Sequence, residues 1–397
     1  LAEAAPAKFL DAVEAALNRT DCPFDKLFAQ EGNVIAGGNY LTGLLWALET
    51  LAWHEDYLTR VTVLLGELAT HDPGGNYVNR PANSLSTIFL PWFPQTTAPI
   101  AKRRIAIETL QKELPDIAWK LLLDLLPNTN QVSGGSHKPA WRDFVPEKQA
   151  NGVTHREYWE QVIGYTDVAI SAAKNDLSKL VDLVGHLDVL PIPAHEQLLM
   201  FLSTEQVIGL PEAKRFQLWT KLGGLVSKHR KFSDAEWAMN TDQVNKLEEI
   251  SKKLEPFTPI YRYQRLFSVR EFDLYEGIGN LEEQNKKLNV RRQKAITEIF
   301  EKGGINAVLE FINIVESPRR VGIAFGTVAE DNVDQVILPE LIENEKKTLE
   351  QFAGGFVSGR YFTRGWQWVD QTDFLHWRPT QIGQILAYLP FKPETWE

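Results

Sequence analysis

The sequence has few of the residues that form covalent or metal cross-links. Cys22 is the one cysteine among 397 residues, which excludes an internal disulfide and a zinc site built from several cysteines. The eight histidines show no ligand spacing, and His195-Glu196 has Leu199 where a zinc-hydrolase helix needs a second histidine. We therefore expect no metal, no cofactor, a reducing cytoplasmic location, and a Cys22 that is a small buried residue.

Long apolar runs and phosphate-binding motifs are absent too. No segment approaches the roughly 20 apolar residues of a membrane helix, and the first residues lack the basic and apolar regions of a signal peptide. None of the glycine pairs is followed by Lys-Ser or Lys-Thr, as a phosphate loop requires, so we expect them to end helices or make turns. Neither membrane insertion nor nucleotide hydrolysis is expected of this chain.

The chain has fewer basic than acidic residues. With 52 acidic and 42 basic residues the net charge is -10, which repels phosphate backbones. Basic residues cluster at 102–104 and again at Lys286, Lys287, Arg291, Arg292 and Lys294. Such clusters are usually solvated helix faces. Nucleic-acid binding by these faces is kept as an alternative function.

Apolar residues recur at helical spacing through most of the chain. Alternating, strand-like runs bounded by turn residues are nearly lacking, so the pattern predicts helices. The clearest stripes are Leu41, Leu44, Leu45, Leu48 and Leu51; Leu58, Val61, Leu64, Leu65 and Leu68; Ala118, Leu121, Leu122 and Leu125; Leu218, Leu222 and Leu225; and Ile305, Val308, Leu309 and Ile312.

Seven prolines follow a leucine, and each pair predicts a helix boundary, because proline disfavours helical geometry in the preceding residue. Short linkers between the resulting segments favour antiparallel neighbours. We predict an all-α fold arranged as an irregular α-solenoid of antiparallel helix pairs, similar to HEAT or tetratricopeptide arrays. No fixed period emerges, so a compact helical domain is the alternative. The pairs are Leu90-Pro91, Leu114-Pro115, Leu126-Pro127, Leu190-Pro191, Leu210-Pro211, Leu338-Pro339 and Leu389-Pro390.

Two stretches interrupt the helical pattern and suggest the organisation of the chain. One is a long loop with a soft domain boundary, and the other is an aromatic-rich connector followed by a long polar helix. Both ends look cut from a longer protein. The expected parts are N-terminal helical repeats at 1–126, the loop at 127–153, middle repeats at 154–255, the connector at 256–280 and C-terminal repeats, truncated at the end, at 281–397.

The long loop contains the best local candidate for catalysis. Small residues around Ser133, Ser136 and His137 could expose a hydroxyl next to an imidazole. No nucleophile elbow and no preceding strand accompany them. A hydrolase that uses the 127–153 loop is therefore an alternative, and we expect the chain not to be an enzyme.

Tryptophan is abundant, with twelve in the chain. Those within helical stripes, Trp46, Trp53, Trp119, Trp159 and Trp219, are expected to pack between helices. The remaining aromatic and arginine clusters are of the types that anchor protein interfaces. The alternative is that they wedge loops onto the helical body. Candidate partner-binding residues are Trp141, Arg142, Arg360, Arg364, Trp366, Trp368, Trp377 and Arg378.

Several short motifs look familiar as a set. They resemble a segment of large bacterial antiviral proteins that join an effector domain, a STAND-type nucleoside triphosphatase and a long helical-repeat sensor. The motifs are GLLWALETLAW at 43–53, DPGG at 72–75, NRPANSL at 79–85, IFLPWFPQT at 88–96, WKLLL at 119–123, WRD at 141–143 and, weakly, GWQW at 365–368.

The resemblance covers about a third of the chain well, and it transfers no site residues. It implies that the chain is the sensor or scaffold part of such a protein, with the triphosphatase and effector elsewhere. Our hypothesis is a non-catalytic recognition and oligomerisation scaffold in anti-phage defence. Its partners would be a protein, such as a phage protein, and other domains of the parent chain.

Overall fold

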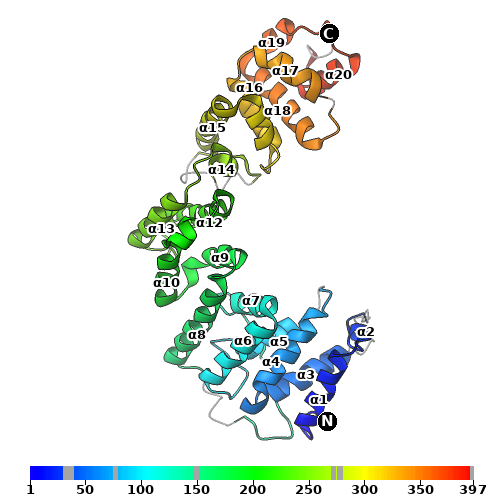
Figure 1. The fold of residues 1–397 in the computed structure, drawn as a ribbon, viewed down its shortest axis with the longest axis vertical. Coiled ribbons are helices and arrows are strands. Elements are labelled where there is room, and N and C mark those ends of the chain that lie inside the picture. Colours follow the sequence, from blue (N-terminus) through cyan, green and yellow to red (C-terminus); the bar gives the residue numbers. More distant parts are fainter. Residues whose placement is uncertain are drawn as a thin grey trace. The chain divides into compact units, whose positions relative to one another are not determined.

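The computed structural model describes residues 1–29, 40–74, 79–145, 152–269, 274, 280–342 and 344–393, with side chains at all of them except 339 and 340. Every regular element among these residues is a helix, so the predicted all-α class is confirmed (Figure 1). They form two compact units, 1–202 and 203–397. Among the described helices, none has the length and apolarity that crossing a membrane requires.

The first unit is built around helix α4. It contacts α1, α3, α5, α6 and α7, and its leucine stripe from Leu58 to Leu68 is buried as predicted. Each such side chain contributes about 1.5–3 kcal/mol when removed from water. The helices of this unit are α1 (Pro6–Leu17), α2 (Asp25–Phe28), α3 (Tyr40–Ala52), α4 (Glu55–Thr70), α5 (Pro81–Phe89), α6 (Ile100–Glu113), α7 (Pro115–Asp124), α8 (His155–Ala173), α9 (Leu177–Val184), η2 (Leu187–Val189) and α10 (Ile192–Leu202).

The second unit centres on the crossing of α16 and α18, with α15, α17, α19 and α20 around it. Its apolar core is rich in phenylalanine, including Phe325, Phe352 and Phe356. The helices are α11 (Glu205–Ile208), α12 (Glu212–Lys231), α13 (Thr241–Leu254), α14 (Pro259–Tyr263), η3 (Gln264–Phe267), α15 (Leu281–Phe311), α16 (Pro318–Val328), α17 (Asn332–Leu341), α18 (Lys347–Arg364), α19 (Trp366–Gln371) and α20 (Pro379–Tyr388).

Local signals account for several helix ends. Thr154 forms a capping box with Glu157 at the start of α8, and Asp176 caps α9. Six of the seven Leu-Pro pairs lie at helix boundaries, as predicted. The prediction is wrong for Leu338-Pro339, which lies inside α17, because the neighbouring helices of the core hold this segment helical.

Consecutive helices contact each other at α3–α4, α6–α7, α8–α9 and α12–α13, which is the neighbour relation expected from short linkers. The solenoid arrangement of these pairs stays a prediction. The compact units divide at 202/203, inside the predicted middle repeats. The soft boundary expected at 127–153 is not where they separate, because the described part of that loop packs back on the first unit.

In the second unit, four glycines lie where two helices pack against each other and not at helix ends or turns. Gly322 and Gly326 of α16 face Gly355 and Gly359 of α18, and a Cβ on any of the four would meet backbone atoms within 2.1–2.3 Å. The two helices therefore approach at backbone distance. The prediction that glycine pairs end helices or make turns is wrong for the pair 354–355, which lies within α18. Only glycine permits the close contact between the two helices there.

The other described glycine pairs are divided. The pair 223–224 lies inside α12, contrary to the expectation, whereas Gly135, with a φ of 80°, makes the expected turn in the long loop. Gly304 has a φ of 61° and interrupts the helical geometry of α15, so two helical segments meet at this kink and the pair 303–304 ends the first of them, as expected. The pair 37–38 and residue 75 lie outside the described residues.

Candidate protein-interaction site

The long loop is tied to the helices of the first unit. The indole Nε1 of Trp53 donates to the carbonyl of His137 at 3.1 Å, and the backbone N–H of His137 donates to the Glu49 carboxylate at 2.8 Å. Earlier in the loop, Gln95 accepts from the backbone N–H of Ser136 at 3.1 Å. These bonds connect positions more than 40 residues apart in the sequence. The described part of the loop is therefore a fixed surface element.

The end of the loop is held by one carboxylate. Glu3 accepts hydrogen bonds from the successive backbone N–H groups of Ala140, Trp141 and Arg142, at 3.2, 2.7 and 3.0 Å. Partial burial opposes ionisation of this carboxyl, but the three donors outweigh it and lower its pKa. The Arg142 guanidinium in turn donates to the carbonyls of Glu3 and Ala4. The backbone on both sides of the Trp141 side chain is thus fixed.

Two tryptophans, one in the loop and one in the adjoining helix α3, are exposed to solvent. Trp141 is 89% exposed although its backbone is anchored, and Trp46 of α3 is 47% exposed. The Trp46 ring stacks on the His137 ring, with centroids 5.0 Å apart and planes 7° apart. Large aromatic side chains held in place at a surface are the usual anchors of protein interfaces.

The prediction that Trp46 packs between helices is wrong. At 3.6 residues per turn, Trp46 lies about 140° around α3 from Leu41, away from the buried stripe. That angle was available from the sequence. The same expectation is correct for Trp53 and Trp119, which are buried, while Trp159 and Trp219 are half-buried.

Trp46, His137, Trp141 and Arg142 line one cleft of about 660 Å³, together with residues 1–4 and the α3 positions Gly43, Ala47 and Thr50. The volume is within the usual range for ligand-binding clefts, about 300–1,000 Å³. Its walls combine two indoles and small apolar side chains with one guanidinium. We refer to it below as the Trp46–Trp141 cleft.

Two of the other predicted interface residues lie in the core of the second unit. Arg360 is fully buried and donates to Asp334 at 2.7 and 2.9 Å and to the carbonyls of Gly326, Ala329 and Glu330. Trp368 is 4% exposed, and its Nε1 donates to the other Asp334 oxygen at 2.7 Å. Both residues are structural, which corrects their assignment to a partner surface. Their bonds connect α16, α17, α18 and α19.

The remaining predicted residues are at or near the surface of that unit. Trp366 is half-buried and packs edge-on against Tyr361, and Trp377 packs in the same way against Phe374. These two fit the alternative that tryptophans wedge short segments onto the helical body. Arg364 is exposed and paired with Asp331, and Arg378 is exposed at the start of α20.

The geometry gives the hydrolase alternative little support. The described contacts of the His137 ring are with Trp46, and the Ser133 hydroxyl accepts a hydrogen bond from the backbone N–H of Gly135 at 3.1 Å. Neither of these is the imidazole–hydroxyl contact that an acyl-transfer centre needs.

The three cations of the first basic cluster, at 102–104, are all bonded to neighbouring residues. Arg103 is buried, and burial lowers its pKa; it donates to Gln161 at 2.7 Å. Lys102, on one side of it, forms ion pairs with Glu55 and Asp56. Arg104, on the other side, forms ion pairs with Glu108 and Asp167.

In the second basic cluster, Arg292 is buried with its Nε bonded to the Leu266 carbonyl at 2.8 Å, and Lys286 pairs with Glu282 at 2.8 Å. Arg291 and Lys294 line a second cleft of about 730 Å³. Three further arginines line that cleft, Arg230, Arg262 and Arg265. Arg230 is paired with Glu248, and Arg262 with Glu255 and Glu298. Paired cations leave less charge for a phosphate backbone.

Comparison of the chain with protein-family models, with curated proteins and with solved structures found no match. The resemblance to STAND-type antiviral proteins therefore rests on sequence motifs alone and stays a prediction.

Proposed function

We propose that this chain is a non-catalytic recognition scaffold that binds a segment of a partner protein in the Trp46–Trp141 cleft. The observation that carries the proposal is the combination of an anchored backbone and an exposed indole at Trp141. A tryptophan that only fastened a loop would be covered by that loop. Here Glu3 performs the fastening, and the indole is left for another surface.

The anchored loop reduces the entropy cost of binding. Ordering a flexible loop and its side chains on association costs roughly 0.5–1.5 kcal/mol for each immobilised side chain. Because the backbone of 140–142 is already held by Glu3 and that of His137 by Glu49, the loop-ordering part of this cost is absent, and the ordering of the exposed side chains remains. A modest contact area can then support binding.

The occupant that fits best is an extended protein segment with an aliphatic or proline side chain. Such a side chain can lie against the two indoles and the small apolar wall of Ala2 and Ala47. The Arg142 guanidinium at the rim is bonded to backbone carbonyls. It lies where carbonyl groups of a bound segment can share its remaining donors.

The wider biological role follows from the resemblance. If the chain is the sensor part of an antiviral STAND-type protein, the bound segment belongs to a phage protein, and binding there triggers the parent protein. Oligomerisation through other surfaces and contacts with further domains of the parent chain belong to the same proposal. The peptide-binding role of the cleft is separable from them.

Selection of a random peptide library on the immobilised chain tests the cleft directly. We expect enriched peptides to carry a shared aliphatic or proline position and to lose affinity by about 2 kcal/mol, roughly thirtyfold, on Trp141→Ala. The control is Phe362→Ala, which removes another exposed aromatic ring, 76% accessible, in the second unit. Peptides that bind both variants as tightly as the original chain would contradict the proposal.

A further inference from the structure

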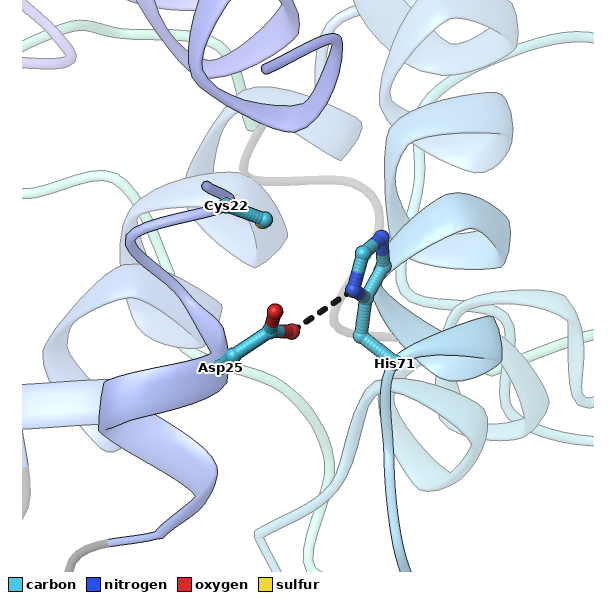
Figure 2. Close-up of side chains that lie close together, drawn as sticks. All are labelled: Cys22, Asp25 and His71. Carbon is cyan, nitrogen blue, oxygen red and sulfur yellow. Dashed lines mark hydrogen bonds and ion pairs between the residues drawn. The ribbon is translucent and has the colours of Figure 1, made fainter. Parts of the chain in front are cut away.

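Three side chains of metal-binding type meet in the first unit, away from the Trp46–Trp141 cleft. Cys22 lies in the turn after α1, Asp25 is the first residue of α2, and His71 follows the last residue of α4. Figure 2 shows them directed toward one another, with one possible ligand atom of each within 4.8 Å of the others. The spacing of 22, 25 and 71 gives no motif, so only the fold brings them together.

We propose that Cys22, Asp25 and His71 form a binding site for a single Zn²⁺ ion. A thiolate, an imidazole nitrogen and a carboxylate oxygen are the three ligand types that zinc takes in proteins. Hard cations such as Mg²⁺ and Ca²⁺ prefer oxygen ligands and are poorly served by a thiolate. Three protein ligands leave the fourth tetrahedral position to water.

The Asp25–His71 distance requires only a small adjustment. His71 Nδ1 and Asp25 Oδ1 are 2.7 Å apart and share a proton. Zinc–nitrogen and zinc–oxygen bonds of about 2.0–2.2 Å at a tetrahedral angle place two such atoms roughly 3.3 Å apart. The ion takes the place of this proton, which the His71 ring then carries on Nε2, and the pair opens by a fraction of an ångström. Side-chain rotation of Asp25 supplies this movement.

Burial and charge also fit the ion. Cys22 is 5% exposed, whereas the side chains of His71 and Asp25 are 29% and 58% exposed, so the open position is on the Asp25 side. On binding, the thiol releases its proton to solvent and becomes a thiolate. The thiolate and the Asp25 carboxylate together balance the two charges of the ion. Without an ion, the Asp25–His71 pair is an ordinary tie between α2 and the end of α4.

Cobalt provides the sharpest test, because Cys22 is the one cysteine of the chain. Co²⁺ added to the metal-free, reduced protein should bind at one ion per chain and show a thiolate-to-cobalt charge-transfer absorption, with visible bands of tetrahedral intensity. Zn²⁺ should displace it and abolish both. Since no other thiol is present, the charge-transfer band identifies the site without any substitution. Absence of this band at saturating Co²⁺ overturns the proposal.

Substitutions then distinguish a built site from scattered surface binding. In calorimetric titration with ZnCl₂, Cys22→Ser and His71→Asn should each weaken binding by roughly a factor of ten or more, since losing even an outer-shell partner costs about that. Zn²⁺ should raise the melting temperature of the original chain and not that of these variants. The control His186→Asn removes an exposed histidine elsewhere and should change neither result. Equal zinc affinity in all four proteins overturns the proposal.

Discussion

Two segments of this chain look alike in composition and differ in their structural role. Trp141-Arg142 in the first unit and Arg360 with Trp368 in the second combine aromatic area with positive charge. Trp141 is exposed on a loop whose backbone is held by Glu3. Arg360 and Trp368 are buried around Asp334. The same residue types lie at the surface in one unit and form core polar contacts in the other.

The difference shows what decides the role of such residues. A tryptophan or arginine becomes structural where the fold supplies a buried acceptor, because an unpaired donor in the core costs free energy. Asp334 of α17 is that acceptor in the second unit. In the first unit the carboxylate that holds the loop end, Glu3, is occupied by three backbone N–H groups. The Trp141 side chain is left without a buried partner.

The largest expected loss of stability comes from breaking the buried Arg360–Asp334 pair. Arg360→Ala removes a guanidinium that is completely enclosed and leaves Asp334 as an uncompensated buried charge. We expect a loss of about 3–5 kcal/mol in the free energy of unfolding. Urea unfolding followed by circular dichroism measures it. The matched substitution Arg142→Ala, at an exposed site, should cost less than about 1 kcal/mol, and equal losses would remove the distinction between the two segments.

The next largest loss of stability is expected when a glycine at the close contact of α16 and α18 is replaced. In Gly322→Ala the new Cβ would lie 2.1 Å from the carbonyl oxygen of Phe352, so the helices must separate. We expect destabilisation of at least about 1–3 kcal/mol. Gly43→Ala in α3 meets no atom within 4 Å and should instead stabilise by about 0.5–1 kcal/mol. Melting temperatures that shift in the same direction for both would contradict the backbone contact.

A substitution that removes only the indole N–H compares the two tryptophans directly. Trp368→Phe deprives a buried Asp334 oxygen of its donor and should cost about 1–3 kcal/mol. Trp141→Phe should change stability by less than about 0.5 kcal/mol, because that side chain is exposed. Thermal unfolding of the two variants beside the original chain provides the measurement. A larger loss at 141 than at 368 would reverse our assignment of surface and core.

The smallest expected effect concerns pH and the Glu3 anchor. Its pKa is lowered in the folded state, so the anchor stabilises fully above the pKa of the unfolded chain and is lost as pH falls through the folded value. Glu3→Gln should therefore reduce stability near pH 7 by less than about 1 kcal/mol, since the group is largely open to solvent. As pH falls below the value of about 4.3 for a free glutamate, the difference should shrink. A difference that grows on acidification would contradict the anchor.

The sequence predicted the helices well where local physics decides them. The leucine stripe of α4 and six Leu-Pro boundaries are short-range signals, and each is found in the structure. The exposure of Trp46 was also readable from the helical angle to its stripe. Trp141 was identified as a loop residue beside a flexible-looking run. The bonds that hold this loop were not predictable, because Glu3 and Glu49 are far from it in the chain.

By itself, then, the sequence determined the all-α class and most helix limits of this protein, since periodicity and capping act over a few residues. Only the tertiary structure decided which polar and aromatic side chains are buried, because burial depends on partners distant in sequence. Asp334 placed Arg360 and Trp368 in the core. The glycines of α16 and α18 became contact points only once the two helices crossed. Cys22, Asp25 and His71 became a candidate metal site for the same reason, because folding joins positions that no local spacing relates.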